Sequence, residues 1–408
     1  MKFSKLSRLI LVSSIGLLVA SLFTACEIQT IDYIYVASSS GSGTGSAGQI
    51  NTFAVDSASG ALRLGAPSVP SGGSSPVAMA VTLDYANLYV ANQGNNSVVH
   101  FAIDGNGILT QKDQVTTGSK PVFLAVNSPG TYLYVVSGTT SATLSEYSLS
   151  SGAIGSAASQ ISLSVPGYTG DTIIPTGVTV LANNTTVSGN AVYVTAYDQS
   201  AYNPGGTATS TANPGWVFGF TVGSGGALIP ASGSPWKAGV KPSAIASDPT
   251  DRFVYVIDYA SNQMIGYSIQ GGSVLNFLTN GPFRTGNEPT AIVIDPRGKY
   301  IYVTNSLDST VAAWSIDLAT GTPAATANVV GSAANTTDTQ PISLVVDPAL
   351  GRFVYTANHL GNSVSGFRLD PDNGTLVTTQ ATPYPTGSQP TAVIAVPHGN
   401  HSAQSVTP

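Results

Sequence analysis

Three polar residues in the second half of the chain could carry hydrolytic chemistry. His359 or Glu288 could activate a water molecule as a general base, and Arg284 could stabilise the oxyanion that develops at an ester carbonyl. Asp258 adds a carboxylate that could bind a substrate. These groups stand out because the 408 residues include only 4 histidines, and only 8% of the residues are charged.

Two long insertions contain further candidate residues. They span 165–171 and 196–215 and are rich in Gly, Ser, Thr and Tyr. Long loops on a rigid scaffold commonly bind ligands. Their candidate substrate-binding residues, which could form a stacking and hydrogen-bonding wall for a sugar-like ring, are Tyr197, Asp198, Tyr202 and Asp171. The alternative is a tolerated insertion without a function.

A repeat of proline and tyrosine must position all of these residues. The prolines are Pro76, Pro121, Pro175, Pro242, Pro289, Pro341 and Pro390, and the tyrosines are Tyr35, Tyr89, Tyr134, Tyr193, Tyr255, Tyr302 and Tyr355. In four of the six complete units the two residues are 13 positions apart. The tyrosines recur every 45 to 62 residues, a period that predicts the blades of a β-propeller.

The two ends of the repeat predict how the ring closes. Tyr35 has no proline unit before it, and Pro390 has no tyrosine strand after it. The C-terminal strand is therefore expected to complete the first blade, which removes the exposed edges that an open array would leave. We predict one all-β, seven-bladed propeller over residues 32–397, followed by a tail at 398–408.

The repeat also explains most of the conspicuous side chains. Asp248, Asp295 and Asp347 all precede a proline, and an aspartate in a turn accepts hydrogen bonds from backbone N–H groups. The repeated tyrosines are expected to pack between blades rather than to bind a ligand. The residues that could be functional are therefore those that depart from the repeat.

The first 25 residues predict export. Three basic residues precede an apolar run at 9–22, which is shorter than the roughly 20 residues that cross a bilayer. Cys26 is the only cysteine, and Phe-Thr-Ala-Cys at 23–26 resembles a bacterial lipobox. We expect lipidation of Cys26, a tether at 26–31 and a location in the cell envelope, at the outer membrane or facing the periplasm. An ordinary cleaved secretory signal is the alternative.

Charge and motif content exclude several classes of function. Without residues 1–25 the chain has 11 basic and 20 acidic residues, a net charge of about −9, and the basic residues are scattered singly. Nucleic acid is therefore not an expected partner. The sequence has no zinc, EF-hand or phosphate-loop motif, so we expect no metal and no cofactor.

Several segments resemble a known family. Tyr302-Val-Thr-Asn, Tyr89-Val-Ala-Asn and the stretch at 295–303 are similar to the YVTN-type repeats of the seven-bladed propeller lactonases, whose named members include 6-phosphogluconolactonases. The resemblance covers about residues 32–397. It implies a seven-bladed ring and the hydrolysis of a lactone.

Two hypotheses for function follow. In the first, the protein hydrolyses a lactone at the central channel with His359, Glu288 and Arg284 as catalytic residues. In the second, it is a non-catalytic envelope propeller that binds a glycan, peptide or partner protein. Both expect a monomer that contacts the membrane through its lipid anchor only. Convergence of His359, Glu288, Arg284 and Asp258 on one pocket would favour the enzyme, and their separation would favour binding.

Overall fold

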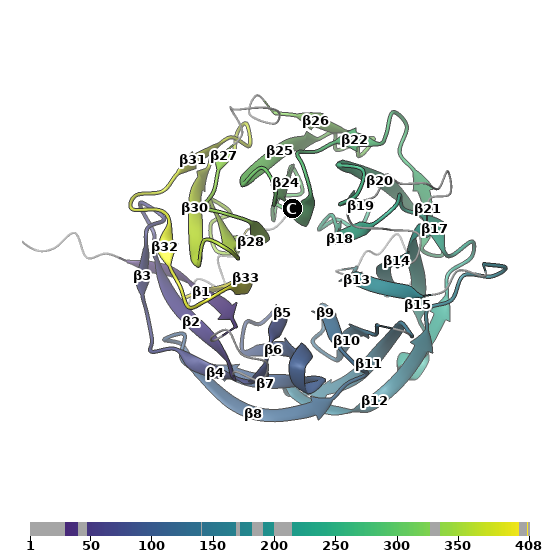
Figure 1. The fold of residues 1–408 in the computed structure, drawn as a ribbon, viewed down its shortest axis with the longest axis horizontal. Coiled ribbons are helices and arrows are strands. Elements are labelled where there is room, and N and C mark those ends of the chain that lie inside the picture. The colour runs from purple at the N-terminus through teal and green to yellow at the C-terminus, as the bar shows by residue number, and fades with distance from the viewer. Residues whose placement is uncertain are drawn as a thin grey trace, which may run out of the picture.

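The chain forms seven antiparallel sheets arranged around a central axis (Figure 1). The computed structural model describes residues 29–39, 47–139, 141–168, 172–181, 191–199, 214–326, 335–399 and 406. Within these ranges the helical content is two short 3₁₀ turns, η1 (Gln93–Asn95) and η2 (Ser224–Gly226). No described helix is long and apolar enough to span a bilayer. The prediction of an all-β, seven-bladed propeller is confirmed.

Each blade begins with an inner strand at the central channel, and its other strands follow outwards. Blade 1 consists of β33 (Pro390–Pro397), β1 (Thr30–Ser38), β2 (Ala47–Asp56), β3 (Leu62–Leu64) and β4 (Val69–Ser74). Blade 2 consists of β5 (Pro76–Val81), β6 (Asn87–Asn92), β7 (Ser97–Ile103) and β8 (Leu109–Thr116). Blade 3 consists of β9 (Pro121–Val126), β10 (Tyr132–Ser137), β11 (Thr143–Ser150) and β12 (Ala153–Ser162).

The remaining four blades each have a short additional outer strand. Blade 4 consists of β13 (Ile173–Val180), β14 (Ala191–Asp198), β15 (Gly215–Val222), β16 (Leu228–Pro230) and β17 (Trp236–Lys237). Blade 5 consists of β18 (Pro242–Ser247), β19 (Phe253–Asp258), β20 (Gln263–Gln270), β21 (Val274–Phe277) and β22 (Phe283–Arg284). Blade 6 consists of β23 (Pro289–Ile294), β24 (Tyr300–Asn305), β25 (Thr310–Ile316), β26 (Pro323–Ala325) and β27 (Asn335–Thr336). Blade 7 consists of β28 (Pro341–Val346), β29 (Phe353–Asn358), β30 (Ser363–Leu369), β31 (Leu376–Thr378) and β32 (Tyr384–Pro385).

The ring closes through the C-terminal strand, as the offset of the repeat predicts. In blade 1, β33 pairs antiparallel with β1, and Tyr35 lies opposite Ile394. The two strands come from opposite ends of the chain and lie side by side in Figure 1. Closure leaves no inner strand without a neighbour, because β33 also packs between β28 and β5.

The repeat prolines mark the start of the inner strands. Six of the seven are the first residue of their strand, and the exception, Pro175, is the third residue of β13. Proline suits this place because the first residue of a strand can do without a backbone N–H donor. We call the end of the channel at which the inner strands begin the mouth.

Buried tyrosines connect neighbouring blades. The central tyrosine of the second strand is fully buried in every blade. In six blades its hydroxyl donates to a backbone carbonyl in the turn between the third and fourth strands of the next blade. The six pairs, 2.6 to 3.0 Å apart, are Tyr35–Gly107, Tyr89–Gly152, Tyr193–Ser273, Tyr255–Gly321, Tyr302–Gly374 and Tyr355–Gly60. The packing prediction for the tyrosines therefore agrees with the structure.

Blade 3 breaks this pattern. The hydroxyl of Tyr134 forms no hydrogen bond with the described residues, and the same is true of the carboxylate of Glu146 beside it. Glu146 is fully buried and lies against Gly226 of blade 4, the turn in which the acceptor would be expected. Burial raises the pKa of Glu146 to about 7 because it disfavours the charged form.

The turns into the second strands are held by aspartates, as expected. The carboxylate of Asp347 accepts the N–H groups of four residues, Leu350, Gly351, Arg352 and Phe353. Asp248 and Asp295 accept N–H groups in the same way. These carboxylates are therefore structural.

We predict that Tyr302→Phe lowers the stability of the protein by about 1 to 2 kcal/mol, because it leaves the buried Gly374 carbonyl without its donor. Tyr134→Phe is the matched control, since Tyr134 makes no such bond. The measurement is the midpoint of urea unfolding for both variants. Equal losses in the two variants would contradict a stabilising role for the inter-blade bond.

We predict that Glu146→Gln raises the unfolding temperature more at pH 8 than at pH 5. The pKa of Glu146 is higher in the folded state than its ordinary value of 4.5, so the folded protein binds the proton more tightly. The folded protein is therefore stabilised while Glu146 is protonated. This stabilisation is lost as the pH rises through about 7. Asp104→Asn, in an exposed turn, is the control. An unfolding temperature difference that does not change with pH would contradict the shift.

Candidate functional site

A cavity of about 400 Å³ lies at the centre of the ring and is lined by all seven inner strands. Its described lining consists of apolar and hydroxyl side chains, without a charged residue. Met79, Phe123, Ile245, Ile292 and Leu344 contribute apolar surface. The channel itself is therefore suited to enclosing an uncharged group.

Hydroxyl groups fasten the inner strands together near the mouth. The residue after the proline donates its hydroxyl to the proline carbonyl of the next blade in three blades. The pairs are Ser243–Pro289, Thr290–Pro341 and Thr391–Pro76, with O···O distances of 2.7, 2.8 and 2.7 Å. These bonds hold the backbone that positions the mouth.

Lys241 is at the centre of a cluster of side chains at the mouth. It directly precedes the proline of blade 5, and its carbonyl accepts the N–H of Tyr259 at 2.9 Å. Its Nζ lies 4.2 Å from the centroid of the Tyr259 ring and 5.7 Å from that of Tyr197 in blade 4. Both distances are in the range of a cation–π contact.

Burial lowers the pKa of Lys241 because it disfavours the ammonium form, and the carboxylate of Glu288 opposes this shift. Glu288 directly precedes the proline of blade 6, the neighbouring blade. The mouth therefore has one half-buried ammonium beside two tyrosine rings and, on the next blade, one half-buried carboxylate.

The backbone of Glu288 is fixed on both sides. It has a positive φ of 53°, and its N–H donates to Asn262 Oδ1 at 2.8 Å. Its carbonyl accepts the N–H of Ser306 at 2.9 Å. The Ser306 hydroxyl also donates to Oε2 of the side chain at 3.3 Å. The backbone of Glu288 is therefore held at the mouth.

His359 lies at the mouth in blade 7. Its N–H donates to the Gln340 carbonyl at 2.8 Å, and its ring Nδ1 is 3.2 Å from the Pro390 carbonyl. With the proton on Nδ1 this contact is a hydrogen bond, and Nε2 is then the nitrogen that can act as a base. His359 and Tyr259 occupy the same position after the second strand of their blades.

Arg284 and Asp258 have different surroundings. Arg284 is exposed in β22 and pairs with Gln263 of the third strand, so two strands separate it from the inner strand. Asp258 is fully buried. It accepts hydrogen bonds from the N–H groups of Val240, Lys241 and Ala260 and from the Gln263 amide. Its carboxylate therefore holds the loop that carries Lys241.

The insertion residues are only partly described. Tyr197 lies beside Lys241, whereas Asp198 is buried and accepts a hydrogen bond from the Tyr168 hydroxyl. The Tyr168 ring meets the Trp216 ring edge-on, with centroids 4.8 Å apart. Asp171, Tyr202 and Cys26 lie outside the described residues.

The structure thus brings together some of the predicted residues but not others. Glu288 and Tyr197 meet around Lys241, and His359 lies at the mouth on the blade beside Glu288. Arg284 does not join them, Asp258 holds the backbone of Lys241 from a buried position, and none of these residues lines the central cavity. Sequence reasoning missed Lys241 and Tyr259. The signal for both was their place in the repeat, one residue before the proline and one after the second strand.

Comparison with known proteins places the chain in a family. Residues 47–169 and 232–401 match the model of the family described as lactonase, 7-bladed β-propeller. No match was found among curated protein sequences.

Solved structures share the fold at low sequence identity. A periplasmic gluconolactonase from Pseudomonas aeruginosa superimposes with a TM-score of 0.71 at 18% identity, covering 90% of this chain and 99% of the other. A proposed 6-phosphogluconolactonase from Bacteroides uniformis gives 0.68 at 19%, covering 90% and 100%. A protein of unknown function from Desulfotomaculum acetoxidans gives 0.64 at 16%, covering 89% and 98%. Because the family model matches most of the propeller, this chain belongs to the lactonase family of seven-bladed β-propellers.

Proposed function

We propose that the protein is an exported, lipid-anchored hydrolase that opens an uncharged lactone at the mouth of the channel. The observation that carries this proposal is the position of Lys241 and Glu288 before the inner strands of adjacent blades, with the Lys241 ammonium beside the rings of Tyr197 and Tyr259. Membership of the lactonase family supports it. So does the structural similarity to a periplasmic gluconolactonase.

The two charged groups suit the two needs of lactone hydrolysis. The Glu288 carboxylate takes a proton from a water molecule, whose oxygen attacks the carbonyl carbon. The Lys241 ammonium stabilises the negative charge that develops on the carbonyl oxygen. The bond between the carbonyl carbon and the ring oxygen then breaks, and the ring oxygen takes the proton back from Glu288. The product is an open-chain hydroxy acid.

The remaining mouth residues position the substrate. The rings of Tyr197 and Tyr259 offer flat surfaces for a sugar-like ring. His359 Nε2, which carries no proton when Nδ1 donates to Pro390, is a second group that can take a proton from the attacking water. A phosphorylated lactone fits poorly with an exported enzyme.

We predict that Lys241→Met and Glu288→Gln each lower kcat/KM for glucono-δ-lactone by about 100-fold, the usual size of an oxyanion or general-base contribution. The measurement is proton release, corrected for the spontaneous reaction. Lys120→Met is the matched control, because Lys120 also precedes a repeat proline but belongs to blade 3. Arg284→Gln is expected to leave the rate unchanged. Equal rates for Lys241→Met and Lys120→Met would contradict the proposal.

The second candidate function is binding without catalysis. It is favoured by the absence of a charged side chain from the described lining of the channel, by the separation of Arg284 from the mouth and by the structural use of the Asp258 carboxylate. A panel of sugar and aliphatic lactones separates the two functions. Saturable binding without hydrolysis of any member would favour the binding propeller.

The lipid anchor has its own test. We predict that Cys26→Ala moves the protein from the membrane fraction to the soluble envelope fraction and removes incorporation of a labelled fatty acid. Ser21→Ala, in the same leader, is the control. Equal membrane association of the two variants would contradict lipidation at Cys26.

A further inference from the structure

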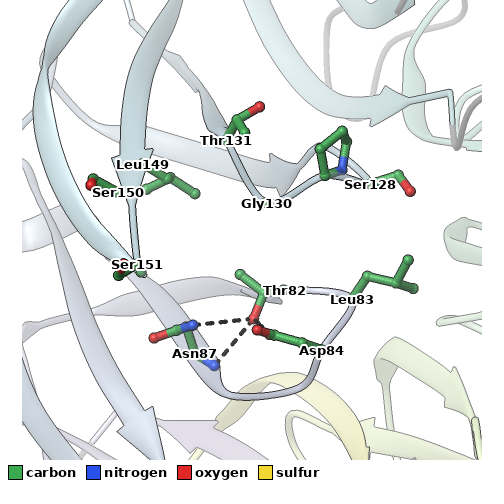
Figure 2. Close-up of a pocket in the computed structure, with 12 residues that line it drawn as sticks. Thr82, Leu83, Asp84, Asn87, Ser128, Gly130, Thr131, Leu149, Ser150 and Ser151 are labelled. Carbon is green, nitrogen blue, oxygen red and sulfur yellow. Dashed lines mark hydrogen bonds between the residues drawn. The ribbon is translucent and has the colours of Figure 1, made fainter. Parts of the chain in front are cut away.

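A second cavity, of about 720 Å³, lies between blades 2 and 3 at the end opposite the mouth (Figure 2). Its walls are the turn from β5 to β6, the turn from β9 to β10 and the turn from β11 to β12. Figure 2 shows Thr82 and Asn87 on one side of the cavity and Gly130 and Thr131 on the other. Its volume lies within the usual range of small-molecule sites.

The cavity arises where one blade departs from a repeated contact. In five blades the residue two positions before the central tyrosine is aromatic: Tyr33, Tyr132, Phe253, Tyr300 and Phe353. Such a ring packs against a glycine in the next blade. A Cβ on Gly321 would lie 2.3 Å from the Phe253 ring, and a Cβ on Gly374 would lie 2.3 Å from the Tyr300 ring.

Blade 2 has Asn87 at this position. The amide still reaches Gly152, whose Cβ would lie 2.1 Å from Asn87 Oδ1, but it occupies less space than a ring. The other exception, Ala191 of blade 4, is fully buried, whereas Asn87 is partly exposed to the cavity. Among the described residues, the missing ring therefore leaves open volume beside Asn87 of blade 2.

Contacts with the buried His100, which in turn contacts Asp113, hold Asn87 in place. His100, which is 3% exposed, has Nε2 at 2.9 Å from Asn87 Oδ1 and Nδ1 at 2.9 Å from Asp113 Oδ2. The histidine ring is also stacked on Tyr89, with centroids 5.2 Å apart. The amide of Asn87 is therefore held in place before any ligand arrives, which reduces the entropy that binding would cost.

The lining is polar without being basic. Asp84 is its one charged residue, and it accepts a hydrogen bond from the Thr82 hydroxyl. Ser128, Ser150 and Ser151 of blade 3 are also among the lining residues. Leu83 and Leu149 add apolar surface. The lining combines a carboxylate, an amide and hydroxyl groups with apolar patches. This combination suits a carbohydrate, whose surface alternates between hydroxyl groups and C–H faces. It disfavours an anion.

We propose that this cavity is a second binding site, separate from the mouth, for a carbohydrate ring that carries no anionic group. Asn87 and Asp84 bind sugar hydroxyls from blade 2, and the serine hydroxyls bind them from blade 3. The apolar C–H face of the ring lies against Leu149. The site supplies recognition of a sugar and no catalytic group.

The test measures binding of named sugars to the whole mature protein by saturation-transfer NMR. The probes are glucose, N-acetylglucosamine, glucosamine and glucose 6-phosphate. At least one of the three sugars without an anionic group is expected to bind saturably, and glucose 6-phosphate is expected to bind at least about tenfold more weakly because of Asp84.

Two variants locate the site. Asn87→Phe restores the ring that five other blades carry and is expected to abolish binding. Asp84→Ala, a change at an exposed side chain, is expected to weaken binding about tenfold, whereas Asp104→Ala, in another exposed turn of blade 2, is expected to leave it unchanged. Lys241→Met should also leave it unchanged, since Lys241 is at the mouth.

Three results would overturn the proposal. They are no saturable signal with any of the uncharged or amino sugars, binding that survives both Asn87→Phe and Asp84→Ala, and binding that is lost in Lys241→Met but retained in Asn87→Phe. The third result would assign the sugar to the mouth. None of these results depends on whether the mouth hydrolyses a lactone.

Discussion

The hydrogen bond from a buried tyrosine hydroxyl to a backbone carbonyl of the next blade is the interaction on which the ring depends. It recurs at six of the seven inter-blade contacts. A buried hydroxyl without a partner is costly, so each bond fixes both the distance and the angle between neighbouring blades. Glycine is favoured in the acceptor turn because an aromatic ring of the neighbouring blade occupies the space of a Cβ.

This constraint determines where chemistry can lie. The middle of each second strand is used for packing, and the inner strands supply an apolar channel with hydroxyl groups. Polar groups that are not used for structure are therefore left at the ends of the strands. Lys241, Glu288 and His359 are at the end where the inner strands begin, and Asn87 with Asp84 is at the other end. Both candidate sites are departures from the repeat.

Two buried acidic residues show how much surroundings change the role of one side chain. Asp258 accepts hydrogen bonds from three N–H groups and one amide, so its charge is compensated and the loop of Lys241 is held. Glu146 has no such donors, and burial therefore raises its pKa to about 7. Glu146 lies at the one inter-blade contact at which the tyrosine hydrogen bond is missing. The contact between blades 3 and 4 therefore differs from the other six.

The sequence by itself determined the seven blades, their closure and the structural role of the repeated Asp and Tyr residues. It could do so because each blade repeats the same local pattern of strand and turn, which needs no knowledge of distant contacts. It also selected Arg284, Asp258 and His359 as departures from that pattern, with Glu288 and Tyr197 as further candidates. Only the tertiary structure decided which departures meet, because neighbouring positions at the mouth come from blades about 50 residues apart. Because of this separation along the chain, the sequence did not reveal that Lys241 and Glu288 lie on adjacent blades at the mouth. For the same reason it did not reveal the cavity that Asn87 leaves beside blade 3.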